Sequence, residues 1–154
     1  MPELISRRAL LARGVAAAAA VVVSPALLRA AAGTPMMVYK DPNCGCCHNW
    51  VEIMRTSGFD VSVKDTTDMP AIKTRYKVGR NLASCHTALV AGYVVEGHAP
   101  ADVIRKLLAE KPKVVGIAVP GMPVGSPGME GGRKDAYEVL TFDAAGKTTV
   151  FAKR

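Results

Sequence analysis

Residues 36–54 have the sequence MMVYKDPNCGCCHNWVEIM, in which an apolar run, a turn and a group of three cysteines follow one another. The run Met36–Lys40 is predicted to be a short buried strand. Asn43 is a candidate N-cap for a helix that extends to about Thr56 and is closed by Gly58. The three cysteines therefore lie at a corner where a strand passes into a helix.

The rest of the chain alternates between strand and helix patterns. Strands are predicted at Phe59–Lys64, Thr87–Val90 and Tyr93–Val95, helices begin at Asp68 and at Pro100, and a hairpin of Glu138–Phe142 and Thr148–Phe151 follows a Gly/Pro-rich loop over 119–132. In the first helix, core positions recur with helical spacing at Cys47, Trp50, Val51 and Met54. This order predicts an α/β fold that is thioredoxin-like, with a central mixed sheet, flanking helices and a C-terminal β-hairpin.

Residues 1–32 are predicted to be an export signal that is cleaved from the mature protein. A basic start precedes the apolar segment Gly14–Leu28 and the small-residue exit Ala30–Ala32. The apolar segment is interrupted by a proline and is shorter than the ~20 residues that span a bilayer, so we expect no stable membrane anchor after cleavage. The pair Arg7-Arg8 resembles a twin-arginine signal, which would carry a folded protein to the periplasm.

Charge and length describe the expected mature segment, residues 33–154. The full chain has a net charge of +7, and the mature segment has sixteen Lys and Arg against twelve Asp and Glu, a net charge of +4. Its basic residues are scattered among acids without interleaved aromatics, which gives no reason to expect a nucleic-acid partner. The segment is of single-domain size and can bury one modest core.

The cysteines at the start of the predicted helix indicate the chemistry. Cys44 and Cys47 have C-x-x-C spacing, and the free N–H groups and dipole of a helix start stabilise a thiolate. Thiolates are soft ligands and good nucleophiles, so Cu(I) binding and dithiol redox chemistry are both feasible. Cys46 adds a third sulfur that a simple dithiol does not need, which favours a metal site. An ordinary disulfide is the structural alternative, since the chain has four cysteines.

Four short motifs resemble those of the family that includes the CopG-type copper-resistance proteins. They are CGCCH at Cys44–His48, SCHT at Ser84–Thr87, VEGH at Val95–His98, and VPGMP with GSPGM in the loop 119–129. Together these motifs span most of the mature segment. The resemblance implies an exported, thioredoxin-like, copper-binding protein that is tied to copper tolerance.

Cys85 supplies the fourth sulfur. In thioredoxin-like oxidoreductases the loop before the third strand usually carries a cis-proline that faces the active dithiol, and Ser84–Thr87 occupies the equivalent stretch here. A proline side chain has no ligand atom, whereas a cysteine has one. We therefore predict that Cys85 joins Cys44, Cys46 and Cys47 in one metal site. A buried cysteine that packs as a small apolar residue is the alternative.

Further candidate ligands are two histidines and two methionines: His86, His98, Met122 and Met129. Imidazole suits copper in either oxidation state, and a thioether binds Cu(I) without losing a proton. The alternative is that the histidines are ordinary surface or core residues, which is our interpretation of His48, and that the methionines fill gaps beneath the loop. The spacing lacks the usual structural zinc signature, so we favour copper as Cu(I), in one or several ions, over zinc.

Two classes of function follow from these residues. The first is an exported copper-binding protein that sequesters Cu(I) or passes it to other exported copper-handling proteins. The second is a thiol–disulfide or copper-redox oxidoreductase that uses Cys44 and Cys47, with Cys46 or Cys85 as a resolving or ligating partner. The extra thiols and the missing loop proline favour binding.

Overall fold

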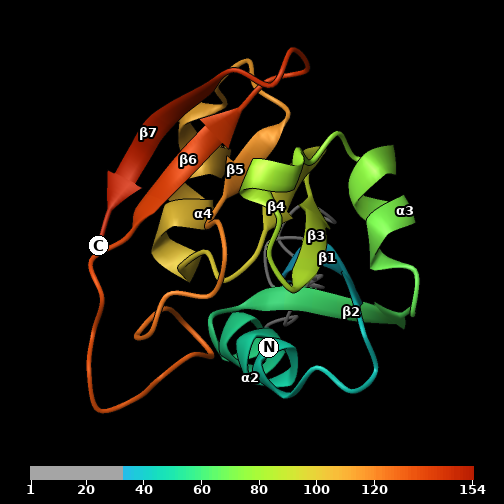
Figure 1. The fold of residues 1–154 in the computed structure, drawn as a ribbon, viewed down its shortest axis with the longest axis vertical. Coiled ribbons are helices and arrows are strands. Elements are labelled where there is room, and N and C mark those ends of the chain that lie inside the picture. The colour runs from blue at the N-terminus through green and yellow to red at the C-terminus, as the bar shows by residue number, and fades with distance from the viewer. Residues whose placement is uncertain (1–32) are drawn as a thin grey trace, which may run out of the picture. The chain divides into compact units, whose positions relative to one another are not determined.

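The computed structural model describes residues 33–154, so the export signal predicted for 1–32 lies outside the described residues. Seven strands form one sheet in the order β2-β1-β3-β4-β5-β6-β7 (Figure 1). The strands are β1 Thr34–Lys40, β2 Phe59–Asp65, β3 His86–Val90, β4 Tyr93–Glu96, β5 Gly116–Ala118, β6 Glu138–Phe142 and β7 Thr148–Lys153. The helices are α2 Gly45–Thr56, α3 Met69–Arg75 and α4 Ala101–Glu110, with a 3-10 turn η1 at Arg80–Leu82.

The sheet is mixed, as predicted. β1 pairs with β2 in parallel and β4 pairs with β5 in parallel, while the other neighbours are antiparallel. In the register between β1 and β3, Lys40 lies opposite His86. The end of β1, from which the chain turns toward the three cysteines, therefore lies beside the start of β3, which follows Cys85.

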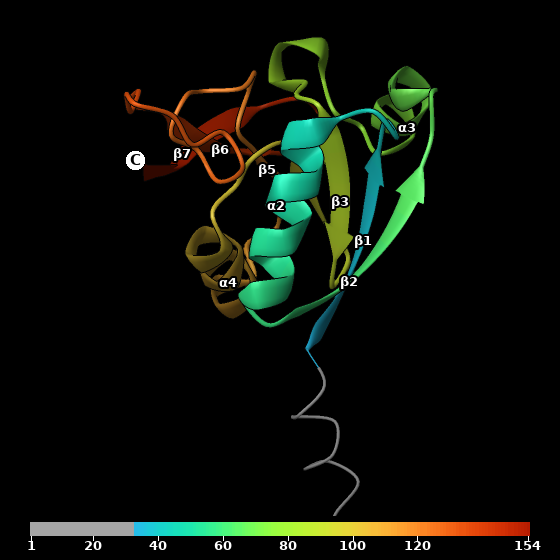
Figure 2. The same ribbon diagram turned by 90° about the horizontal axis from the view of Figure 1, so that it is seen from below.

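Two apolar clusters lie on the two faces of the sheet. The larger one joins α2 and α4 to the strands through buried residues that include Trp50, Met54, Ile104 and Leu107. Figure 2 shows these two helices beside the sheet, with α3 separated from α2 by the strands. The smaller cluster contains Phe142 of β6, Val78 from the segment after α3, and Leu82 of η1. The mixed α/β prediction is confirmed, and the C-terminal hairpin is present as β6 and β7.

The start of α2 differs by one residue from the prediction. Cys44 is the N-cap, and its side chain makes no capping hydrogen bond. Asn43 was expected to be the cap, but the Asn43 N–H donates to the Asp41 carboxylate over 2.8 Å, and the Cys44 N–H donates to the Asp41 carbonyl over 3.1 Å. These bonds close a turn around Pro42 and delay the helix. Cys46 and Cys47 consequently lie in the first turn of α2.

The other helices begin where the sequence predicts. Asp68 caps α3 by accepting from the Ala71 N–H, and Pro100 is the N-cap of α4. α3 ends at Arg75, because Tyr76 is its C-cap and Lys77 takes a positive φ of 61°. α3 contributes no fully buried residue.

Two elements were not predicted, η1 and β5. β5 has only three residues, which is too short for a period to be visible, yet it joins β4 to β6 and completes the sheet. A Cβ at Gly116 would lie 1.9 Å from the Val94 carbonyl oxygen, so this strand pairing requires glycine. Among residues 33–154, no helix combines the length and the apolar character needed to cross a membrane.

Candidate metal centre

Four cysteine sulfurs meet at the N-terminal end of α2. Cys44, Cys46 and Cys47 come from the strand-to-helix corner, and Cys85 comes from the loop before β3. The four Sγ atoms all lie within 4.8 Å of one another. Cys46 Sγ is 3.6 Å from Cys44 Sγ and 3.8 Å from Cys85 Sγ. The structure thus brings together the four predicted sulfur ligands, including the one that is distant in sequence.

Two of the four sulfurs are joined. Cys44 and Cys47 form a disulfide, whereas Cys46 and Cys85 are free thiols. The disulfide alternative raised by the cysteine count therefore applies to the C-x-x-C pair in this state. Reduction of this bond, which needs two electrons and two protons, is required before all four sulfurs can act as thiolate ligands.

Cys85 also lies against His98. The Cys85 Sγ is 2.8 Å from His98 Nε2, and the other ring nitrogen, Nδ1, is 2.7 Å from the Pro127 carbonyl oxygen. A carbonyl only accepts, so Nδ1 carries the proton and donates it to Pro127. Nε2 therefore presents its lone pair to the thiol, as a neutral metal-binding imidazole would.

His86 is fully buried beside the same thiol. Its Nδ1 is 3.6 Å from Cys85 Sγ, and its ring packs on Trp50 with 4.3 Å between centroids. Its Nε2 has no hydrogen-bond partner among the described residues. Because buried polar atoms are nearly always paired, this unpaired nitrogen is consistent with a site that takes a metal ion. Cys85, His86 and His98 form a second group whose potential ligand atoms lie within 4.8 Å of one another.

Burial sets the protonation of these groups. Desolvation, followed by the neighbouring Cys46, raises the pKa of the Cys85 thiol to about 12. Desolvation also lowers the pKa of His98, and it holds the pKa of His86 well below its ordinary value. At neutral pH both imidazoles are therefore neutral and able to ligate, while Cys85 keeps its proton until a cation replaces it.

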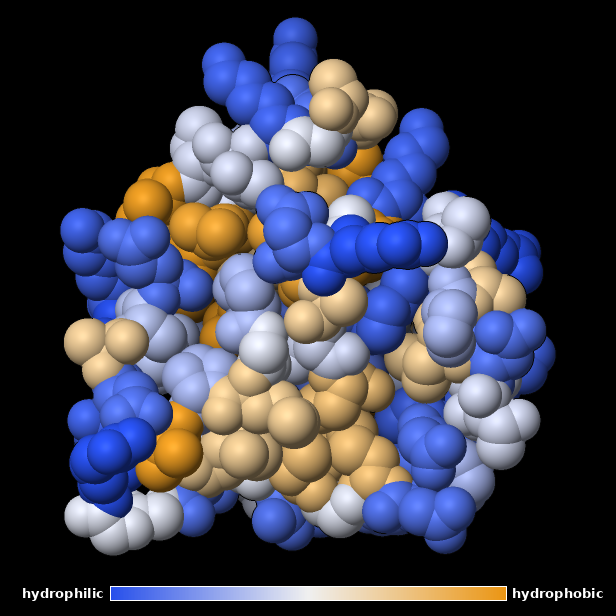
Figure 3. Space-filling view, in the orientation of Figure 1, coloured by the Kyte–Doolittle hydropathy of each residue, from blue (hydrophilic) through white to orange (hydrophobic). Residues whose placement is uncertain are grey.

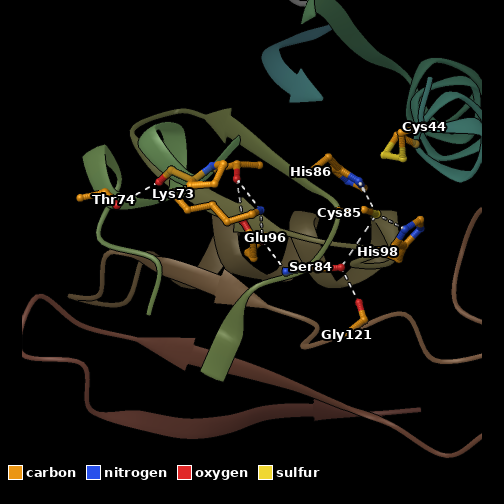
Figure 4. A network of polar contacts seen from close by, with 12 residues as sticks. Cys44, Lys73, Thr74, Ser84, Cys85, His86, Glu96, His98 and Gly121 are labelled. Atoms are coloured by element: carbon orange, nitrogen blue, oxygen red, sulfur yellow. Dashed lines mark hydrogen bonds and ion pairs between the residues drawn. A yellow bond between two sulfur atoms is a disulfide. The ribbon is translucent and has the colours of Figure 1, made fainter. Parts of the chain in front are cut away.

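The Gly/Pro-rich loop 119–132 approaches the site at three places, of which Figure 4 shows the contact between Ser84 and Gly121. Ser84 Oγ donates to the Gly121 carbonyl, the Pro127 carbonyl accepts from His98, and a Cβ at Gly128 would lie 2.8 Å from the Cys46 carbonyl oxygen. Met122 follows the first contact and is 53% exposed, and Met129 follows the last and is partly buried. The loop is thus placed to cover the sulfurs, and ligation by the two methionines stays a prediction.

His48 lies on the surface beside the sulfur site. His48 is exposed, and its Nδ1 lies 3.0 Å from the Cys44 carbonyl oxygen, so of the two ordinary roles expected for it, surface or core, it has the first. In Figure 3 a moderately apolar area lies over α2, with hydrophilic side chains around it. The sulfur site is therefore set in a mixed surface.

Sequence reasoning missed a buried polar network behind Cys85. The Glu96 carboxylate is fully buried and accepts hydrogen bonds from Lys73 Nζ, the Ser84 N–H and Thr87 Oγ1. Burial raises the pKa of Glu96, and the Lys73 ammonium opposes that shift. The available signal was a glutamate directly after the apolar residues of β4, because a charge in a buried strand needs a partner.

The fold and the site together define a small mixed α/β domain with a cysteine-rich candidate metal centre at the start of its first described helix. A family described as "Protein of unknown function, DUF411" matches residues 82–129. Two solved structures, both titled copper resistance protein copG (Form 1 and Form 2), are 46% identical to this chain. They cover 79% of it and are themselves 98% covered, with TM-scores of 0.75 and 0.76 respectively. No curated protein matches. The chain belongs to the family of CopG copper resistance proteins.

Proposed function

We propose that this protein is an exported copper-binding protein that coordinates Cu(I) through Cys44, Cys46, Cys47 and Cys85 and contributes to copper resistance or handling. The observation that carries the proposal is the meeting of the four sulfurs within 4.8 Å. Soft thiolates select soft ions such as Cu(I). The titles of the solved relatives, which name copper resistance, support the same metal.

The donor set also supports more than one ion. Cys85 belongs both to the four-sulfur group and to the group with His86 and His98, so its sulfur is placed to bridge ions held on either side. His98, through its neutral Nε2 lone pair, and His86, through its ring nitrogens beside Cys85, supply the nitrogen ligands of this second group. Four thiolates would also suit zinc, so the identity of the metal requires a direct test.

A second candidate function is thiol–disulfide or copper-redox chemistry at Cys44 and Cys47. The specific observation in its favour is the disulfide between these residues at a helix start. A strand, a turn and a helix that begins with C-x-x-C, with parallel β1 and β2 beside it, support a thioredoxin-like arrangement. In this role one thiolate of a dithiol partner attacks the disulfide and releases one cysteine. The partner's second thiol then attacks the resulting mixed disulfide, so that Cys44 and Cys47 become the dithiol and the partner leaves as a disulfide.

The cellular location is part of the proposal. Residues 1–32 act as a cleaved twin-arginine signal, and the domain 33–154 reaches the periplasm already folded. A reducing cytoplasm would then keep the four thiols free until export. Copper ions, and other exported copper-handling proteins that deliver or receive them, are the expected partners.

Cu(I) titration of the reduced protein under anaerobic conditions tests this function. We expect saturable binding that protects all four thiols from alkylation. A variant with serine at all four cysteines should lose high-affinity binding, whereas His48→Ala, which changes an exposed residue beside the site, should retain it. Unchanged binding by the four-serine variant would overturn the proposal. Tighter binding of Zn²⁺ than of Cu(I) would show that the site is a zinc site and not a copper site.

A further inference from the structure

We propose that Glu96, held by Lys73, is a positioning residue that fixes Cys85 opposite the cysteines of α2. The inference rests on the proposed function, because it names the groups behind the metal ligands that set their geometry. Neither residue contacts the cysteine sulfurs through a described hydrogen bond, so both act through the backbone of the loop before β3. Partners of this outer kind orient metal ligands in many proteins.

The Glu96 carboxylate satisfies three donors from three different segments. Its Oε1 accepts from Lys73 Nζ of α3 over 2.5 Å and from the Ser84 N–H over 2.7 Å. Its Oε2 accepts from Thr87 Oγ1 over 2.6 Å, across the β3–β4 pair in which Thr87 and Glu96 are in register. A fully buried carboxylate is stable only with such partners. Figure 4 shows Lys73 and Ser84 converging on Glu96.

Ser84 links the Glu96 carboxylate to the position of Cys85. Its N–H is bound by Glu96, its hydroxyl donates to the Gly121 carbonyl, and Cys85 follows it directly. Gly97 allows the close approach, since a Cβ there would lie 2.6 Å from the Ser84 side chain and the glycine has φ +73°. The segment Glu96–His98 therefore holds Cys85 in two ways. Glu96 binds the backbone of the preceding residue, Ser84, and His98 contacts the Cys85 thiol itself.

Lys73 makes α3 part of this arrangement. α3 has no fully buried residue, yet its Lys73 side chain is only 14% exposed and also reaches Thr87 Oγ1 at 3.4 Å. Loss of the ammonium would leave the Glu96 charge buried without a counter-ion, which is far more costly than loss of an exposed ion pair. Lys73 therefore holds the carboxylate that accepts from Ser84 in place.

A cross-linking measurement tests the positioning without metal. In a Cys44→Ser/Cys47→Ser background, one of the two remaining thiols attacks the S–S bond of oxidised glutathione and releases one reduced glutathione. The other thiol then attacks this mixed disulfide, which forms the Cys46–Cys85 disulfide and releases the second reduced glutathione. We expect Glu96→Ala to slow this reaction about tenfold, because small misplacements of reacting atoms reduce rates strongly. Glu96→Gln should stay within about threefold of the background, since its amide oxygen still accepts from Ser84. An equal or faster rate in Glu96→Ala would overturn the inference.

Cu(I) affinity of the otherwise native chain gives the second readout. We expect Glu96→Ala and Lys73→Met to weaken Cu(I) binding about tenfold or more, with Glu96→Gln largely restoring it. Leu107→Ala, which opens a cavity in the core under α4 and removes no hydrogen bond of this network, is the control for general destabilisation and should bind normally. If the wild-type protein bound no Cu(I), the proposed function would fail while the cross-linking result still decided the role of Glu96. If Leu107→Ala lost as much affinity as Glu96→Ala, the positioning role would be wrong.

Discussion

Cys46 Sγ and Cys85 Sγ lie 3.8 Å apart although 39 positions separate these residues in the chain. The contact joins the first turn of α2 to the loop before β3, and the pairing of β1 with β3 brings these two segments together. A sulfur in this loop lies beside the Cys44–Cys47 pair, and the described part of the chain has no cis peptide bond. This relationship is what distinguishes a four-sulfur site from a simple dithiol.

Replacement of Cys85 separates the two candidate functions. Cys85→Ser should weaken Cu(I) binding at least about tenfold, because it removes a ligand, and should leave Cys44 and Cys47 able to form their disulfide. Competition with a Cu(I) chelator measures the first effect, and thiol counting after mild oxidation measures the second. Full copper affinity in Cys85→Ser, together with efficient disulfide reduction by the wild type, would favour the oxidoreductase.

Cys85 should be unreactive at ordinary pH in the metal-free protein with the Cys44–Cys47 disulfide intact. Its pKa is raised to about 12 by burial and by Cys46, so very little of it is thiolate near pH 8. Alkylation followed by mass spectrometry should modify Cys46 well before Cys85, and modification of Cys85 should accelerate as the pH rises. Equal rates for the two thiols at pH 8 would contradict this environment.

The metal-free protein should lose stability as the pH falls below about 6.5. Burial lowers the pKa of His86, so the unfolded chain binds a proton that the folded chain excludes, and the free energy of unfolding decreases with acidification. Each such histidine contributes up to about 1.4 kcal/mol per pH unit below the unfolded pKa. Urea unfolding at pH 7 and pH 5 measures the slope.

His86→Phe is the matched variant for this slope, because it keeps a ring against Trp50 and removes the titrating group. It should flatten the pH dependence. The raised pKa of Glu96 works in the opposite direction, since its contribution is lost as the pH rises, but it is common to both proteins. An unchanged slope in His86→Phe would rule out His86 as its source.

Gly128 should be required for the loop to rest on α2. It has φ +83°, and a Cβ there would lie 2.9 Å from the Trp50 backbone nitrogen. Gly128→Ala should lower the free energy of unfolding by about 1–3 kcal/mol and increase the alkylation rate of Cys46. Gly132→Ala in the same loop meets nothing within 4 Å and should stay within about 0.5 kcal/mol of the wild type. Equal effects of the two substitutions would contradict the loop contact.

Export should depend on the arginine pair of the leader. Arg7→Lys/Arg8→Lys keeps the charge but removes the twin-arginine signal, so the precursor should accumulate in the cytoplasm. Cell fractionation and the mass of the exported chain, with cleavage expected close to Ala32, provide the measurement. Normal export of the variant would favour the general secretory route.

Much of the fold was visible in the sequence because its elements carry clear local signals. Asp68 and Pro100 mark helix starts, and the apolar face of α2 follows helical spacing. β5 was missed because three residues show no period, and its identity as a strand comes from pairing with β4 and β6. The N-cap of α2 was misplaced because the Asp41 side chain competes for the Asn43 N–H.

The residues of the site were predictable where their side chains are known ligands of soft metals. Cysteines and histidines that suit one soft metal were selected by type, and the sheet then brings Cys85 and His98 together. The buried Glu96 could be suspected from its place after the apolar residues of β4, but its partners Lys73 and Ser84 could not, since they come from segments that only the folded structure brings together. The oxidation state of Cys44 and Cys47 depends on conditions and not on spacing alone.

X-ray absorption at the copper edge of the anaerobically loaded protein tests the four-thiolate site most directly. We predict an edge typical of Cu(I) and a first shell dominated by sulfur, with the sulfur contribution reduced in Cys85→Ser. Loading should also leave no thiol of Cys44, Cys46, Cys47 or Cys85 open to alkylation. A first shell of nitrogen and oxygen only, with all four thiols still reactive, would contradict the account.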